Sequence, residues 1–261
     1  GFLHDPEDKR DLANKFIYDS EDEGLEIYRY FYSDTARSIL TDVIDSSPEM
    51  DDYYDRARAS KNILRHIADS ENQKNLESAV DLCVESISDL RKFTDLYDYE
   101  DYGVYLNLGW FILEKYFCEK NIERKKPENE DLDEAITQLG KSLYLCEDEC
   151  PEDYENLAII HQYISRAYDE MGRNVEDSDK KIELLKKAEE YQEKCANYTA
   201  EADDIYVLAS IQKDIYSMTK DPKIITNSLE NLKMSYELDG NEETKKEIDD
   251  LKKDLSDLIA D

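Results

Sequence analysis

The stretch Ala135-Ile136-Thr137-Gln138-Leu139-Gly140-Lys141-Ser142-Leu143-Tyr144-Leu145 places small and aliphatic residues at intervals of three and four. Residues at this spacing share one face of an α-helix. The pattern returns at 228–238 and, more weakly, at 79–86 and 182–188. Because alternating small and large residues let a second helix pack closely against such a face, the recurrence predicts a stacked array of helices, whose usual work is binding.

Helical periodicity can be followed along almost the whole chain. We expect about eleven helices, joined by short connections that make successive helices antiparallel neighbours. The 261 residues include only seven Gly and five Pro, too few for a turn-rich β protein of this size, and no segment reads as a convincing strand. The 40% of hydrophobic residues fall in periodic stripes, which favours a folded chain over a disordered one.

Several residues mark where these helices begin and end. Ser20 and Glu23 form a possible capping box at the start of a helix that reaches about residue 45. Gly172 is a natural C-terminal cap for the helix that precedes it. Asp221-Pro222 is expected to begin a helix that Gly240 ends.

Two of the expected helices share a frame, written Tyr105-x-x-Leu108-Gly109-x-x-Ile112 and His161-x-x-Ile164-Ser165-x-x-Tyr168. The stretch 229–240 is similar to the end of the same unit. This frame resembles the tetratricopeptide repeat, although the units here recur at about 46 residues against about 34 in that family. The resemblance implies an all-α, right-handed α–α superhelix, a tetratricopeptide-like solenoid of antiparallel helix pairs.

The resemblance also implies a division of the chain and a binding surface. We expect an N-terminal helical pair at 1–50, repeats at 51–240 and a C-terminal capping helix at 241–261, all in one continuous solenoid. The leading helix of each pair is expected to line a concave groove. The residues expected to face it are Leu106, Trp110, Leu113, Glu114, Ile159, Gln162, Arg166 and Asp169. Trp110, the only tryptophan, fits the core of a packing face as well as it fits the groove.

Such a groove predicts a non-enzymatic scaffold or adaptor that binds a protein or peptide partner. A chaperone or peptide-sensing regulator of the same fold is one alternative, and a helical metal-dependent enzyme or its regulatory domain is another. Some members of the family grip a C-terminal carboxylate with Lys and Asn at groove positions. Leu106, Trp110 and Gln162 hold comparable places here, which favours an extended or helical peptide as the ligand.

The charge of the chain restricts its partners. Lys and Arg number 33 and Asp and Glu number 65, so the net charge is −32. A field of this sign repels phosphate backbones and anionic lipids, so we expect no nucleic-acid and no membrane partner, and a basic or amphipathic protein segment instead. The one basic cluster, Lys120 with 124–126, is followed at once by acidic residues. Mimicry of a nucleic acid is a further possibility that rests on charge alone.

Cysteine usage points to a compartment. Five Cys, an odd number, stand mostly inside helical patterns, which predicts free thiols in a reducing, cytoplasmic setting. No run of about 18 apolar residues is present in the sequence. The chain begins at Gly1 rather than Met, which we interpret as the start of a region excised from a longer protein.

No catalytic or metal motif is recognisable, and we expect no cofactor. Cys146 and Cys150 with His161 are zinc-ligand types, but the spacing is not that of a finger and a fourth ligand is missing. The twenty Tyr include clusters at 28–32 and 97–105. Tyr rings bury well at the edge of a core with their hydroxyl groups in water, and exposed Tyr also serves as binding surface, so both interpretations stay open.

Overall fold

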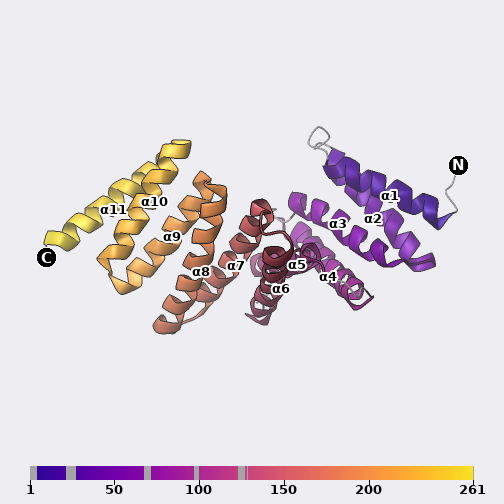
Figure 1. The fold of residues 1–261 in the computed structure, drawn as a ribbon, viewed down its shortest axis with the longest axis horizontal. Helices are drawn as coiled ribbons and strands as arrows, with labels where there is room; N and C mark the ends of the chain where they lie inside the picture. The colour runs from indigo at the N-terminus through magenta and orange to yellow at the C-terminus, as the bar shows by residue number, and fades with distance from the viewer. Residues whose placement is uncertain are drawn as a thin grey trace. The chain divides into compact units, whose positions relative to one another are not determined.

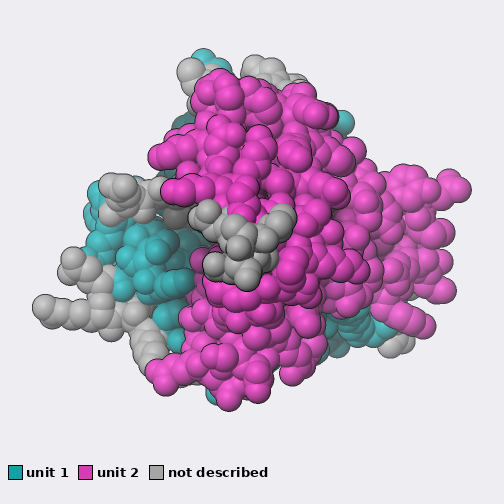
Figure 2. Space-filling model, turned by 90° about the vertical axis from the view of Figure 1, so that its left-hand side faces the viewer, with its two compact units in different colours: residues 1–142 teal, residues 143–261 magenta. Residues whose placement is uncertain are grey.

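The computed structural model describes residues 5–21, 28–67, 72–96, 100–122, 127 and 129–260. Eleven helices and no strand lie within these ranges, which confirms the predicted all-α class. The chain divides into two compact units, 1–142 and 143–261, coloured separately in Figure 2. We describe each unit by itself, and the boundaries expected at 50 and 240 stay predictions.

Unit 1 contains five helices and most of a sixth (Figure 1). They are α1 (Pro6–Glu21), α2 (Arg29–Ser46), α3 (Met50–Ile67), α4 (Gln73–Leu96), α5 (Tyr102–Asn121) and α6 (Asn129–Glu149). From α1 to α5 each helix packs on the next, and α1 also contacts α3. Its first core cluster joins α1, α2 and α3 through small and aliphatic residues, Ala13, Ile17, Ala36, Leu40 and Ala59.

Unit 2 contains the end of α6 and five further helices. They are α7 (Tyr154–Asn174), α8 (Ser178–Thr199), α9 (Ala202–Thr219), α10 (Pro222–Asp239) and α11 (Glu242–Ala260). From α7 onward each helix packs on its successor, as Figure 1 shows for this half of the chain. Helix α11 covers apolar residues of α9 and α10 with Ile248 and Leu251.

The helix ends confirm part of the sequence interpretation. The side chain of Asp221 accepts a hydrogen bond from the backbone of α10 with Pro222 in the first turn, and Gly240 ends that helix with φ 69°. Two expectations were wrong. Ser20 lies inside α1, where its buried Oγ donates to the carbonyl oxygen of Ile17 at 2.6 Å, and its proposed partner Glu23 lies outside the described residues.

Gly172 is the second correction, because α7 continues past it to Asn174. A Cβ atom at Gly172 would stand 3.2 Å from the side chain of Leu185. The residue therefore allows α8 to approach closely, and the absence of a side chain serves packing rather than termination.

The small residues of the recurrent pattern allow close helix approach, as predicted, and three serines among them also form hydrogen bonds between helices. Ser142 Oγ donates to the carbonyl oxygen of Tyr102 in α5 at 2.8 Å. Ser165 and Ser228 repeat this bond, each at 2.8 Å to a backbone carbonyl of a neighbouring helix. A small hydroxyl residue at these positions thus brings two helices together and satisfies its own buried oxygen.

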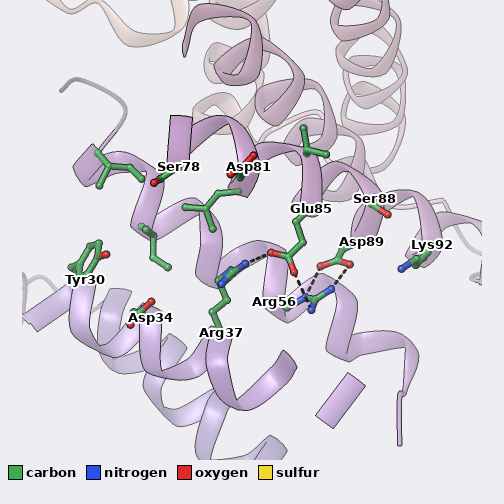
Figure 3. Close-up of a pocket in the computed structure, with 14 residues that line it drawn as sticks. Tyr30, Asp34, Arg37, Arg56, Ser78, Asp81, Glu85, Ser88, Asp89 and Lys92 are labelled. Atoms are coloured by element: carbon green, nitrogen blue, oxygen red, sulfur yellow. Dashed lines mark hydrogen bonds and ion pairs between the residues drawn. The ribbon is translucent and has the colours of Figure 1, made fainter. Parts of the chain in front are cut away.

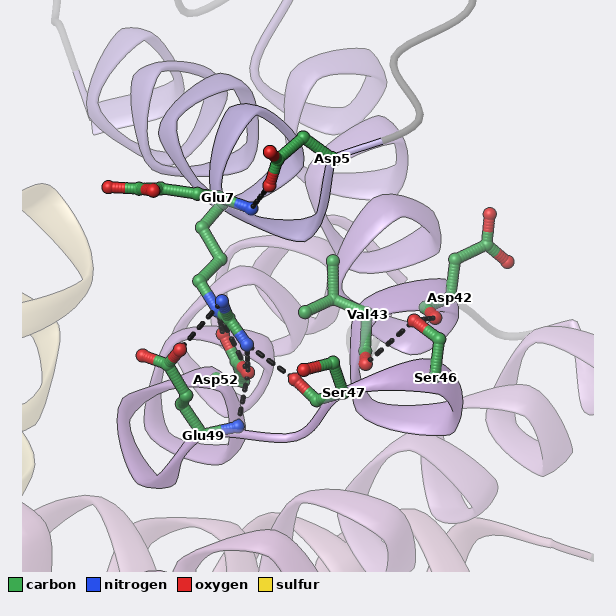
Figure 4. A network of polar contacts seen from close by, with 9 residues as sticks. Asp5, Glu7, Asp42, Val43, Ser46, Ser47, Glu49 and Asp52 are labelled. Atoms are coloured by element: carbon green, nitrogen blue, oxygen red, sulfur yellow. Dashed lines mark hydrogen bonds and ion pairs between the residues drawn. The ribbon is translucent and has the colours of Figure 1, made fainter.

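An ion network fixes the start of unit 1 (Figure 4). Arg10 of α1 donates to both carboxylate oxygens of Asp52, from Nε at 2.9 Å and from Nη2 at 3.1 Å. Its guanidinium also reaches Glu49, at 2.8 Å, and the backbone oxygen of Ser47. These contacts hold α1 against the first turn of α3 and the connection that precedes it.

Candidate binding grooves

A groove in unit 2 runs along α7 between α8 and α9. It consists of two adjoining cavities that share Gln162, an inner one of about 260 Å³ and an outer one of about 440 Å³. We call the two together the unit 2 groove. The inner cavity includes the apolar side chains of Val207 and Ile211, and the outer one includes Tyr154 and Tyr198. The groove therefore offers both apolar and polar groups to a ligand.

Four of the residues expected to face a groove line this one. They are Ile159, Gln162, Arg166 and Asp169, which share one face of α7. Gln162 and Arg166 are exposed, whereas Ile159 and Asp169 are half-buried. The predicted face of α7 therefore lines a cavity of unit 2, and its role in binding stays a prediction.

The other four expected residues belong to α5 in unit 1. Leu113 is fully buried, Leu106 and Trp110 are nearly so, and Glu114 is half-buried. The ring of Trp110 lies edge-on to Phe111 with a centroid distance of 4.9 Å. The three apolar side chains therefore lie in the core, and a binding role for the α5 set stays a prediction.

Asp204 of α9 accepts hydrogen bonds from both other helices that line the unit 2 groove. The sequence patterns did not single it out. Its Oδ1 accepts a hydrogen bond from Gln162 of α7 at 3.2 Å, and its Oδ2 accepts one from Thr199 of α8 at 2.7 Å. Its backbone oxygen accepts a third from Gln192 at 3.1 Å. In the sequence Asp204 looks like any acidic residue in a first helical turn, so no signal marked it.

The charged side chains that line the groove are mainly acidic. Glu155, Glu201 and Asp204 line the outer cavity, while Asp169 lines the inner one together with Arg166. Burial raises the pKa of Asp169, and a hydrogen bond from Arg173 at 3.0 Å opposes that shift. The field inside the groove therefore favours a cationic ligand.

A ladder of five neighbouring rings follows the contact between α7 and α8. Tyr154 stacks on Tyr198 at 5.7 Å, Tyr198 on His161 at 5.8 Å and Tyr191 on Tyr168 at 5.8 Å, measured between ring centroids. His161 and Tyr191 join these pairs at 5.6 Å with their planes tilted by 40°. Each helix supplies its rings at a spacing of seven residues, which keeps them on one face. Burial lowers the pKa of His161 to about 4, so the imidazole is neutral in the ladder.

The three possible zinc ligands differ in their surroundings. His161 is buried between two Tyr rings, Cys146 is buried, and Cys150 is exposed. Throughout the described ranges, no group of three or more His, Cys, Asp or Glu side chains is arranged to hold a metal ion. In the same ranges, no helix is long and apolar enough to cross a bilayer.

Unit 1 also has a groove, of about 660 Å³, between α2, α3 and α4 (Figure 3). Arg56 donates to both oxygens of Asp89 at 2.8 Å, and its Nη1 lies 3.2 Å from Glu85. Arg37 pairs with the other oxygen of Glu85. Because both guanidinium groups already have carboxylate partners, this network holds the three helices together rather than offering an open charge.

Comparison with known proteins gives similarity at the level of the fold. No family model matches the chain, and no curated protein matches it. Solved structures do match: TTC0263, a thermophilic TPR protein of Thermus thermophilus, has 15% identity, covers 98% of this chain and 100% of its own, and has a TM-score of 0.47. MamA has 19% identity, covers 78% of this chain and 95% of its own, and has a TM-score of 0.32.

Each of these likenesses is one of fold alone. A designed helical repeat protein, DHR64, also matches, with 15% identity, 98% coverage of this chain, 96% of its own and a TM-score of 0.20. Identities below 20% and TM-scores below 0.5 transfer no partner or activity, so function has to come from the grooves themselves.

Proposed function

We propose that the protein is a non-enzymatic interaction scaffold that binds a basic, amphipathic segment of a protein partner in the unit 2 groove. The observation that carries this proposal is that α7, α8 and α9 line a groove that combines apolar side chains with charged groups that are mainly carboxylates. An amphipathic segment would place its apolar side chains against Val207 and Ile159 and its cations beside the carboxylates.

The rest of the chain supports such a ligand. A net charge of −32 steers cationic partners towards the protein and keeps anionic ones away. All five cysteines are free thiols, four of them buried, which agrees with the reducing cytoplasm that we propose as the compartment.

A test needs to separate binding in the groove from general attraction to an acidic surface. Peptides are selected from a displayed random library on the wild-type protein, synthesised with a fluorophore, and titrated by fluorescence polarisation against Val207→Asp and Met234→Asp. Val207 lines the groove and is 42% exposed, while Met234 of α10 is 49% exposed and does not line it. Each variant adds one negative charge, so general attraction would strengthen equally in both.

The expected result is enrichment of basic amphipathic peptides whose affinity falls about tenfold or more in Val207→Asp, because a buried apolar contact is replaced by a carboxylate. Met234→Asp should bind like the wild type. Equal affinity for both variants, or a library that yields no binder, would contradict the proposal.

A further inference from the structure

The ring ladder of unit 2 is covered by cations over only part of its length. The ammonium group of Lys194 lies 5.3 Å from the ring centroid of Tyr191, and that of Lys187 lies 5.6 Å from the centroid of Tyr168. In the described part of the chain, no Lys or Arg lies over Tyr154 or Tyr198, the two rings at the other end. Rings of this ladder therefore already bind cations of the protein itself, whereas the rings at its outer end have no such cation among the described residues.

That outer end opens into the outer cavity of the unit 2 groove. Tyr154 is 55% exposed and Tyr198 is 40% exposed, and both line the cavity. Tyr154 is the terminal ring of the ladder, so its stacking partner Tyr198 lies on one side only. A planar group of about the size of one side chain has room here, since the cavity measures about 440 Å³.

Two carboxylates flank these rings. Glu155 and Glu201 are exposed, and among the described residues neither forms an ion pair. Glu201 stands at the N-terminal boundary of α9, but its side chain makes no capping hydrogen bond there. The side chain of Asp204, in contrast, is engaged with Gln162 and Thr199. The outer cavity itself has no Lys or Arg among its lining residues.

We propose that the outer cavity is an arginine pocket, in which the guanidinium group of one arginine of the bound segment stacks on the free face of Tyr154, the terminal ring, and donates hydrogen bonds to Glu155 and Glu201. This inference rests on the proposed function, because it names the side chain that the groove selects. Arginine fits better than lysine because a guanidinium is planar, weakly hydrated and able to stack on a ring while donating in its own plane to two acceptors.

The pocket can be tested without a peptide. N-acetyl-arginine amide is titrated into isotopically labelled protein, and the chemical-shift changes of the backbone amides of Tyr198 and Thr199 are followed by NMR. N-acetyl-citrulline amide, which has the same shape without the charge, and N-acetyl-lysine amide are titrated in parallel. We expect saturable shifts for the arginine probe, and binding about tenfold weaker or undetectable for the citrulline and lysine probes.

Matched variants locate the site. Tyr154→Leu and Glu201→Gln should each weaken binding of the arginine probe several-fold, because they remove the terminal ring or one acceptor. Tyr144→Leu and Glu193→Gln are the controls, since both residues are exposed in unit 2 and neither lines the groove. These controls should leave the affinity unchanged.

Several results would overturn the arginine pocket. Equal shifts with the citrulline probe, equal or tighter binding of the lysine probe, or unaltered binding in both Tyr154→Leu and Glu201→Gln would each do so. If these results appear while library peptides still depend on Val207, the arginine pocket is wrong and the groove proposal stands. If the arginine probe behaves as expected but no peptide depends on Val207, the pocket stands and the scaffold proposal fails.

Discussion

Two glycines of unit 1 invite the same substitution with opposite expected results. A Cβ atom at Gly109 of α5 would stand 2.6 Å from Leu139 Cγ and 3.2 Å from the carbonyl oxygen of Ala135, both in α6. At Gly140 of α6, a Cβ atom would have nothing within 4 Å. Carbon atoms pack at about 3.5–4.0 Å, so Gly109→Ala forces either Leu139 or a whole helix to move by about 1 Å. Leu139 is fully buried, so its side chain can move only by displacing other core atoms.

The free energies follow from these distances. Overpacking costs about 1–3 kcal/mol, and the better helix propensity of Ala returns up to about 1 kcal/mol, so Gly109→Ala should lower the free energy of unfolding by about 1–2 kcal/mol. Gly140→Ala gains the propensity without the clash and should raise it by about 0.5–1 kcal/mol.

Urea unfolding followed by the fluorescence of Trp110 measures this directly, because the only tryptophan of the chain lies in unit 1. With circular dichroism as a second probe, the two midpoints should move in opposite directions at similar slopes. Equal stability of Gly109→Ala and Gly140→Ala would refute the close contact between α5 and α6, and with it the explanation of the small residue at this position of the repeat frame.

Three further predictions concern buried polar groups. Asp89→Asn should lower the free energy of unfolding of unit 1 by about 2–3 kcal/mol in the same assay, because Arg56 then keeps only Glu85 as an ionised partner. The control is Asp42→Asn, which should cost less than about 0.5 kcal/mol because the side chain of Asp42 is 71% exposed in its ion pair. Burial raises the pKa of Asp55 to about 6, so its neutral form stabilises the fold at low pH and this contribution is lost as the pH rises through about 6. Asp55→Asn should therefore match the stability of the wild type near pH 4 and exceed it by about 1–2 kcal/mol at pH 7.5. Urea titrations at both pH values measure this difference. The pH dependence of stability at His161 has the opposite sign. Because its pKa is lowered to about 4, its contribution to stability is fully present above pH 6.5 and is lost as the pH falls towards about 4. His161→Phe keeps a stacking ring and should remove that loss in thermal melts of the whole chain between pH 7 and pH 4.5.

The sequence predicted the helical array well because its strongest signal is a backbone property. Small and apolar residues at intervals of three and four define a helix face whatever its neighbours are, so the class and the approximate number of helices followed. The ends were less secure. Ser20 has the residue type of a cap, but a bond to Ile17 within α1 and another from Asn62 use its hydroxyl group, and no local pattern announces a partner 42 residues away.

The candidate site was predictable to the extent that it depends on one helix. The face of α7 that carries Gln162 and Arg166 could be proposed from the sequence because periodicity fixes which residues point the same way, and its role in binding stays a prediction. Its partners could not be identified, since Asp204 acts through hydrogen bonds to two other helices and has no helical pattern of its own. On α5 the same reasoning met a mostly apolar helix, where periodicity does not separate a groove residue from a core residue such as Trp110.

Charge and shape have different parts in the proposed binding. A net charge of −32 acts over about a Debye length, roughly 8 Å at physiological ionic strength, and attracts every cationic segment alike. Discrimination then has to come from contacts that hold after the encounter, and in unit 2 these are the apolar side chain of Val207 and the rings at Tyr154 and Tyr198. Added salt should therefore slow association with a selected peptide and leave its dissociation nearly unchanged, whereas Val207→Asp should accelerate dissociation at every salt concentration. A protein that used only its acidity would show the reverse, with dissociation as sensitive to salt as association and indifferent to a change inside the groove.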